Sequence, residues 1–224
     1  MHSILILYIE IQQERIINND NIMGVCTCVR SLSLSSQSNL IVSSSQSATK
    51  DDTLTSFEYT LFSEINSVRT SPSEYANKLK QLLSNLIIEN STCFFVYNNK
   101  EKLVLQKGTH TFIEAIDYLK SLSPMNKLNW NDELKVRMTN VNKKISSIGN
   151  LILEKRTELL AKYDAIMFNL DIFSDPVLSV IFQITDEAFD HQRRNDLFNK
   201  KFKMFAVTYT YDYNKKFMSI STLA

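Results

Sequence analysis

The residues best suited to acid–base chemistry lie close together near the end of the chain, where Asp186 and Glu187 precede His191. An imidazole changes charge near neutral pH, and a neighbouring carboxylate can fix its tautomer, so these side chains have the composition of a general acid–base pair. Such a pair also needs a nucleophile or a group that anchors the substrate, and the sequence identifies neither. His110 lies far earlier, and nothing in the sequence brings it to His191. We therefore expect His191, Glu187 and Asp186 to be structural or vestigial.

The residue types do not indicate a metal or cofactor site. A zinc ion takes at least three nitrogen, oxygen or sulfur ligands from the protein, and one histidine beside two acids is too small a set. The chain contains only 3 Gly in 224 residues, and neither GxGxxG nor GxxxxGK[ST] occurs, which excludes glycine-built phosphate cradles. We expect no cofactor, no metal and no small-molecule substrate.

A second chemical pattern is the run Met23-Gly24-Val25-Cys26-Thr27-Cys28. If translation began at Met23, Gly24 would be an acceptor for myristate and Cys26 and Cys28 would be candidates for palmitate, the two signals that stable membrane anchoring needs. With Met1 as the start, Gly24 is internal and cannot be acylated. Membrane association through acylation is therefore an alternative that depends on the start codon.

Charge and cysteine content exclude further classes. The formal net charge is +1, from 25 Lys and Arg against 24 Asp and Glu, so no long-range field favours nucleic acid. We interpret the basic and aromatic run 193–205 as a solvated loop whose aromatic side chains turn inward. Cys26, Cys28 and Cys93 cannot form a disulfide framework, which favours a reducing, intracellular compartment over secretion.

The composition divides the chain into three parts. Residues 1–30 form a tail with one apolar segment, Ile4–Ile11, and residues 31–52 form a Ser-rich linker, because nine of the 17 residues from 31 to 47 are Ser. Residues 53–224 form the domain. We expect Ile4–Ile11 to be a docking segment for a protein partner.

Helix signals dominate the first part of the domain. Thr55 and Glu58 form a capping box before a helix over 56–69, and Ser71 to Glu74 forms a second box before another helix. A loose hairpin over 93–106 is followed by a helix over 111–122. The apolar stripe from Trp130 to Ile148 predicts one long helix, and Asn129 or Asn131 is expected to cap it.

The later part ends in strands. Further helices are expected over 151–163 and after Asp175, where Pro176 suits the first helical position. The segments 205–211 and 216–223 are rich in β-branched and aromatic residues and flank a turn-forming run, so they predict an antiparallel hairpin. Helices first and strands last indicate an α+β domain, with helices packed around a small antiparallel sheet.

Three separated blocks resemble the CAP superfamily, in its SCP-like branch related to cysteine-rich secretory proteins. The run 62–76, FSEINSVRTSPSEYA, is similar to the first-helix signature of that family. Residues 114–130 resemble its helix, Pro-containing turn and Leu-x-Trp entry, and residues 190–199, DHQRRNDLFN, are similar to its Gly-His-Arg-x-Asn-x-Phe-Asn element. The resemblance covers about 57–224 and implies an α-β-α sandwich.

The resemblance also implies a cleft with two histidines and two acids, and this chain matches half of it. His191 corresponds to the second histidine, and Asp186 and Glu187 lie where the second acid is expected. The family's Gly-His and Gly-Glu-Asn elements are absent. We therefore predict a degenerate member, a pseudoenzyme.

The sequence thus leaves two functions open. The first is a non-catalytic interaction or structural module in a larger intracellular assembly, for which a cytoskeletal or axonemal filament would be a suitable setting. The alternative is a small-ligand-binding or hydrolytic protein that uses the His191 side of the cleft, membrane-associated or secreted.

Overall fold

The computed structural model describes residues 54–97, 101–142, 148–211 and 217–224. The tail 1–30, with Ile4–Ile11, Gly24, Cys26 and Cys28, lies outside the described residues, and so does the Ser-rich linker 31–52. The description below concerns the domain.

Helices and strands alternate irregularly along the domain. In chain order they are α1 (Ser56–Thr70), α2 (Pro72–Gln81), a 3-10 turn (Leu82–Asn85), β1 (Leu86–Glu89), β2 (Thr92–Tyr97), β3 (Glu101–Leu105), α3 (His110–Ser121), β4 (Asn129–Trp130), α4 (Asp132–Asn142), α5 (Ile148–Leu160), β5 (Met167–Asp171), α6 (Pro176–Ile184), α7 (Gln192–Leu197), β6 (Met204–Tyr211) and β7 (Phe217–Leu223).

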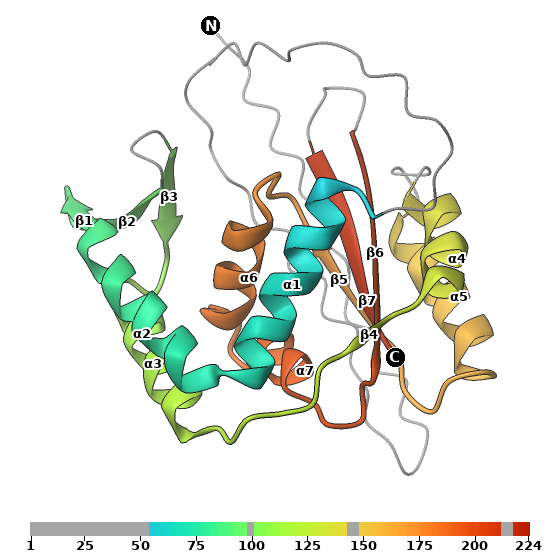
Figure 1. The fold of residues 1–224 in the computed structure, drawn as a ribbon. Coiled ribbons are helices and arrows are strands. Elements are labelled where there is room, and N and C mark those ends of the chain that lie inside the picture. Colours follow the sequence, from blue (N-terminus) through green and yellow to red (C-terminus); the bar gives the residue numbers. More distant parts are fainter. Residues whose placement is uncertain (1–53, 98–100, 143–147, 212–216) are drawn as a thin grey trace, which may run out of the picture.

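A four-stranded sheet in the order β4-β6-β7-β5 forms the middle layer. β6 and β7 pair antiparallel from Ala206 opposite Thr222 to Tyr211 opposite Phe217, which confirms the predicted closing hairpin. Helices α1 and α6 cover one face of this sheet, and α4 and α5 cover the other (Figure 1). The fold is α+β with a helix–sheet–helix order of layers.

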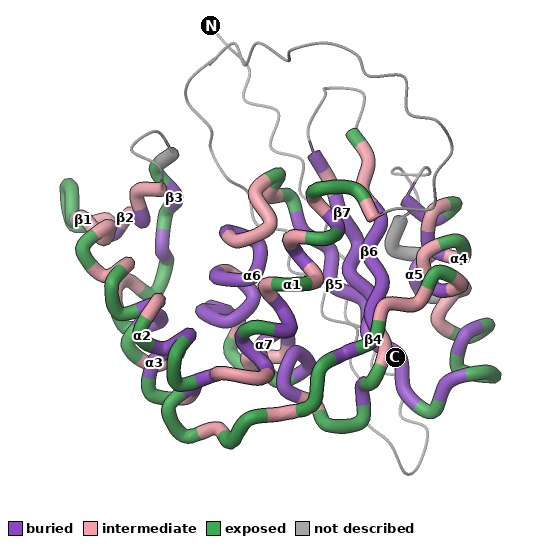
Figure 2. Tube along the Cα trace, viewed as in Figure 1, coloured by how far each residue is buried: buried purple, intermediate pink, exposed green. Residues whose placement is uncertain are grey.

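Two apolar cores, one on each face, hold the layers together. Leu61, Ile65 and Ile181 of α1 and α6 pack with β-strand side chains on one face, and Leu134 and Met138 of α4 pack on the other. Strands β5 and β7 between them are almost entirely buried, and β6 is buried over 205–208 (Figure 2). All five residues of β5 are buried, so this strand lacks the alternating pattern by which a half-exposed strand is identified in a sequence.

Local capping signals had mixed outcomes. The capping box of α1 is formed as predicted, with Thr55 accepting from the Glu58 amide and Glu58 accepting from the Thr55 amide. Ser71 makes no side-chain cap on α2, so the second box is not formed, although Pro72 occupies the first turn as expected. Asn131 caps α4 by accepting from the Leu134 amide at 3.0 Å.

The predicted long helix from Trp130 to Ile148 is wrong. Trp130 lies in β4, where the Asn129–Trp130 pair is hydrogen-bonded to β6, and α4 (Asp132–Asn142) begins only at Asp132. Residues 143–147 of the predicted helix lie outside the described residues. The tryptophan ring is half-buried against Phe62 and Phe205. Pairing with the sheet therefore displaces the helix start, while the remaining stripe residues of α4 are buried as expected.

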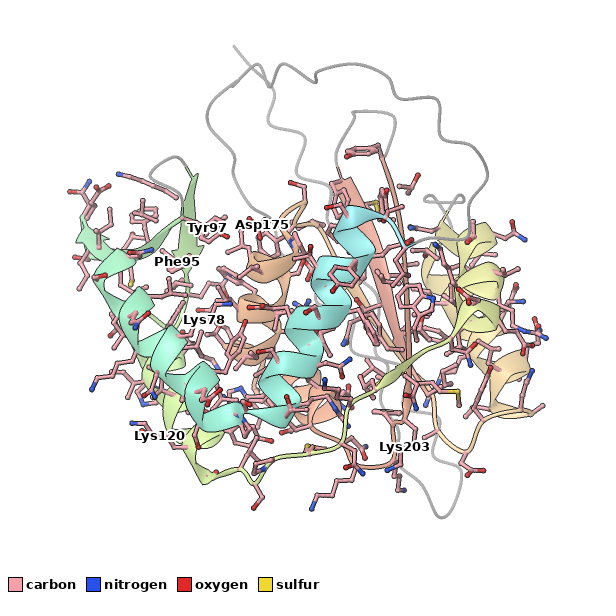
Figure 3. The ribbon with its side chains drawn as sticks, viewed as in Figure 1. Lys78, Phe95, Tyr97, Lys120, Asp175 and Lys203 are labelled. Carbon is pink, nitrogen blue, oxygen red and sulfur yellow. The ribbon has the colours of Figure 1, made fainter. Side chains whose placement is uncertain are left out.

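Helices α2 and α3, with the small sheet β1-β2-β3, form a flank outside the α1–α6 layer (Figure 1). The hairpin of β2 and β3 confirms the expected pairing, and β1 adds a strand that was not predicted. Tyr97 at the end of β2 donates to Asp175, the cap of α6, at 2.8 Å (Figure 3). This contact ties the flank to the main body.

A buried network on α1 fixes two loops near the C-terminal elements. The side-chain amide of Asn66 accepts a hydrogen bond from the Leu128 backbone amide at 2.7 Å and donates one to the Leu128 carbonyl at 3.2 Å. Arg69 is almost fully buried and donates to the backbone carbonyls of Asn126, Leu197, Asn199 and Phe202. These two residues of the first-helix block therefore position the entry to β4 and the α7–β6 loop.

Candidate functional site

The predicted site residues lie in the short loop between α6 and α7. Both carboxylates hold backbone amides there, because Asp186 accepts from the Arg193 amide at 2.9 Å and from the Ala188 amide at 3.1 Å. Glu187 accepts from the Lys107 amide at 2.9 Å, which joins the loop to the segment before α3. Each acid is more than nine-tenths buried. Their contacts shape the loop.

His191 ends the loop in a left-handed conformation, with φ of 48°. Its Nδ1 lies 2.7 Å from the backbone oxygen of Asp186, and its Nε2 lies 2.9 Å from Oε1 of Glu114 on α3. The carbonyl can only accept, so Nδ1 donates to it, and Nε2 donates to the Glu114 carboxylate when the ring is protonated. Both ring nitrogens are therefore occupied by oxygen atoms of the protein.

Glu114 is the residue that connects the loop to α3. Arg194 of α7 donates to the same Oε1 atom at 2.6 Å, and its guanidinium lies over the Tyr118 ring at 4.8 Å. Burial acts to raise the pKa of Glu114, but the hydrogen bond and charge of Arg194, with His191 and His110 nearby, outweigh it and lower that pKa. Arg194 thus favours the carboxylate form of Glu114.

His110 lies near Glu114 and so comes closer to the site than the sequence indicated. It begins α3 one turn before Glu114, and its Nδ1 lies 3.9 Å from Glu114 Oε2. Its side chain is 80% exposed, so this is a loose surface pair rather than a fixed contact. Among the residues that the structure describes, no three His, Cys, Asp or Glu side chains are grouped so that they could hold a metal ion.

The arginines of the run 193–205 are buried, which corrects the prediction of a solvated loop. Arg193 lies 3.2 Å from the Asp171 carboxylate of β5, and both side chains are shielded from solvent. The aromatic part of the prediction is confirmed, since Phe198, Phe202 and Phe205 are buried. Arg193 and Arg194 therefore pair with Asp171 and Glu114, while Lys200, Lys201 and Lys203 of the same run are exposed as predicted.

Asp196 is an ionisable residue that sequence analysis did not single out. Burial raises its pKa to about 7, Asp186 and Asp190 add to the effect, and the hydrogen bond from Gln192 and the charge of Arg156 oppose it. Gln192 donates to its Oδ1 atom at 2.7 Å. Because Asp196 is 4% exposed, it is an internal group of α7.

One apolar side chain of the loop points outward. Phe189 is 97% exposed, although the residues around it are fixed by the contacts of Asp186, Glu187 and His191. Burial of such a ring is favourable wherever a partner provides an apolar surface. The loop therefore combines an ordered backbone with an exposed aromatic tip.

The main residue missed in the sequence is Glu114. It lies on α3, and only the packing of α3 beside the α6–α7 loop brings it to His191. Its four-residue spacing from His110 is a helical one, but the predicted helix began at residue 111, and only the observed start of α3 at His110 places both on one helical face. That signal does not reveal the partner on α7.

Comparisons with known proteins give one structural similarity. No protein-family model matches the chain, and no curated protein matches it. Among solved structures it is similar to a cysteine-rich secretory protein from Staphylococcus aureus subsp. aureus Mu50, with 14% identity and a TM-score of 0.35. The similarity covers 70% of this chain and 60% of that one, so this chain spans less than two thirds of that protein.

None of the helices in the described part of the chain combines the length and the apolar character that a membrane span requires.

Proposed function

We propose that this chain is a non-catalytic, CAP/SCP-like interaction or structural module of a larger intracellular assembly. The observation that carries the proposal is the full occupation of the His191 ring, with Nδ1 on the Asp186 carbonyl and Nε2 on Glu114. A general base or a metal ligand needs a nitrogen lone pair directed at the reacting group. In this arrangement both nitrogens face oxygen atoms of the protein.

The carboxylates support the same proposal. Asp186 accepts two backbone amides, and Glu187 accepts the Lys107 amide. A hydrolytic role at His191 would require Glu114 to release Nε2, although Arg194 also holds that carboxylate. These contacts favour a structural role for the matched half of the cleft over the alternative of ligand binding or hydrolysis.

Phe189 is the most exposed candidate for contact with a partner. An aromatic ring on a loop with a fixed backbone loses little conformational entropy when it is buried in an interface. Phe189→Ser should weaken binding to the native assembly at least tenfold in co-sedimentation. Ile88→Ser, which removes another exposed apolar residue from β1, is the matched control and should leave binding unchanged.

The N-terminal arm is the second proposed contact. We propose that Ile4–Ile11 docks on a protein partner, because an eight-residue apolar segment gains about 1.5–3 kcal/mol for each large side chain it buries. Deleting residues 1–21 should release the chain from its assembly. Intact-mass measurement separates this from acylation, since a native chain that begins at an acylated Gly24 would exclude the docking arm.

Zinc and ester hydrolysis test the non-catalytic proposal directly. The full chain and its His191→Asn variant should show the same melting temperature with and without zinc chloride, and the same background hydrolysis of p-nitrophenyl acetate. The alternative function is supported instead if zinc stabilises the unaltered chain but not the variant, or if hydrolysis falls at least tenfold in the variant.

A further inference from the structure

A polar patch interrupts the apolar core on the α1–α6 face of the main sheet. In β5 and β7, Asn169 lies opposite Ser221 and Asp171 lies opposite Ser219. Directly opposed residues of an antiparallel pair share a face, and positions two apart along one strand share it too. These four side chains, called the sheet patch below, are therefore contiguous.

The face of the patch follows from its neighbours in the same registers. Met167 and Val207 lie on this face, since Met167 is two residues from Asn169 and Val207 lies opposite Ser221. Both belong to the core that contains α1 and α6 residues. The patch is thus enclosed between the sheet and the helical layer, and each of its four residues is at most 4% exposed.

Several polar atoms of the patch have no hydrogen-bond partner among the residues that the structure describes. They are Nδ2 and Oδ1 of Asn169 and the hydroxyl oxygens of Ser219 and Ser221. Asp171 differs, because it accepts from the amides of Ile172 and Phe173 and from Arg193. The patch therefore presents both donors and acceptors, next to a carboxylate that is already paired.

Buried polar groups of this kind lower the stability of the fold when their hydrogen bonds are left unmade, and native proteins satisfy nearly all of them. A water molecule fits the requirement, since it donates two hydrogen bonds, accepts two and needs two to four polar partners. Asn169, Ser219 and Ser221 are each at most 1% exposed, which favours a small molecule that reaches the interior through local opening. Apolar ligands are disfavoured by the same polar atoms.

We propose that the sheet patch is an internal binding site for water, in which bound molecules bridge Asn169, Ser219 and Ser221. The site is independent of the function proposed above. It adjoins the His191 loop through one side chain, because Arg193 contacts Asp171 and its amide donates to Asp186.

Substitution of the hydroxyls tests the proposal by the sign of the stability change. If water occupies the patch, the double variant Ser219→Ala/Ser221→Ala removes partners of the bound molecules and should lower the melting temperature of the full chain by about 3–6 °C. If the patch is dry, the same change removes unpaired hydroxyls, and the melting temperature should stay equal or rise.

Thr222→Val is the matched control. Thr222 is on the same strand but points to the opposite face, beside Phe168 and Ala206, and its hydroxyl also has no partner. Its directly opposed neighbours are both apolar, so a water molecule would find fewer polar partners there than in the sheet patch, and this change should leave the melting temperature equal or raise it.

Oxygen-17 magnetic relaxation dispersion gives the direct measurement, because it counts long-lived internal waters in solution. The unaltered chain should hold at least one more such water than the double variant. An equal count would overturn the proposal, as would a stability gain in the double variant. Native mass spectrometry covers the remaining case, since a co-purified solute lost in the double variant would replace water as the occupant.

Discussion

Two polar networks hold the segments around α7, and they differ in the partners they use. Asn66 and Arg69 lie inside the protein and bond to backbone groups, so every partner is uncharged and fixed by the fold. His191 and Glu114 lie at the edge, and their contacts involve a carboxylate, an imidazole and Arg194. The first network therefore defines the frame, while the second closes a loop on it.

The same difference separates two of the blocks that resemble the CAP superfamily in sequence. In the block over 62–76, Asn66 and Arg69 contact buried backbone groups. In the block over 190–199, His191 contacts the Asp186 carbonyl and Glu114. The two sets of contacts therefore use different partners and can be tested separately.

The largest expected effect is at Arg69. Replacing it with Met removes the donor for up to four buried carbonyls, which should lower the free energy of unfolding by about 4 kcal/mol or more. Arg69→Lys keeps the charge but not the planar guanidinium group. Its free energy of unfolding should therefore lie between those of the unaltered chain and the Met variant. Urea denaturation at pH 7 measures both. A loss below about 1 kcal/mol for the Met variant would show that the frame does not depend on this network.

Asp196 of α7 lies between the two networks and should dominate the pH dependence. Its folded-state pKa of about 7 is raised above the unfolded value near 4, so the folded state binds the extra proton and stability falls as pH rises from about 4 to 7. Asp196→Asn should abolish this fall and raise stability at pH 8 by about 3 kcal/mol. Urea denaturation across pH 4–8 checks it, and identical profiles would contradict the assignment.

Asn66 offers a smaller test of the frame. Asn66→Ala removes both contacts with Leu128 and leaves two buried backbone groups unpaired, which should cost about 2 kcal/mol. Asn66→Asp keeps the acceptor but sets a carboxylate oxygen against the Leu128 carbonyl and buries a charge, so it should cost more than Asn66→Ala at pH 7. The order of the two in thermal unfolding checks the geometry, and the reverse order would argue against it.

Glu114 should make stability depend weakly on pH, with the opposite sign to the dependence caused by Asp196. Its folded-state pKa is lowered, so its contribution to stability is present above the unfolded pKa and is lost as pH falls through the folded one. Because the side chain is 35% exposed, Glu114→Gln should cost only about 0.5–1 kcal/mol at pH 7. The two proteins should have equal stability in urea at pH 3, and a difference that persists there would have another cause.

Local signals in the sequence predicted the parts of the fold that depend on neighbouring residues. The Thr55–Glu58 box, the Asp175 cap before Pro176 and the closing hairpin all involve contacts within a few residues or one turn. The start of α4 failed because Trp130 pairs with β6, a contact remote in sequence. β5 was missed because burial on both faces removes its alternation.

The site was predictable to a lesser extent. His191, Asp186 and Glu187 are neighbours in one loop, and the sequence placed them together. Their partners Glu114 and Lys107 come from the α3 region and meet them only through tertiary packing. The burial of Arg193 and Arg194 likewise follows from acids on β5 and α3, which no local pattern reveals.

The central claim is that His191 and Glu114 use their hydrogen-bonding capacity on each other. A double-mutant cycle with His191→Asn and Glu114→Gln measures that directly, since Asn tolerates the left-handed backbone at 191 and so isolates the side-chain contact. Urea denaturation at pH 7 should give a coupling free energy of about 0.5–1 kcal/mol. A coupling free energy of zero would contradict the account, because it would leave the His191 nitrogen free for chemistry.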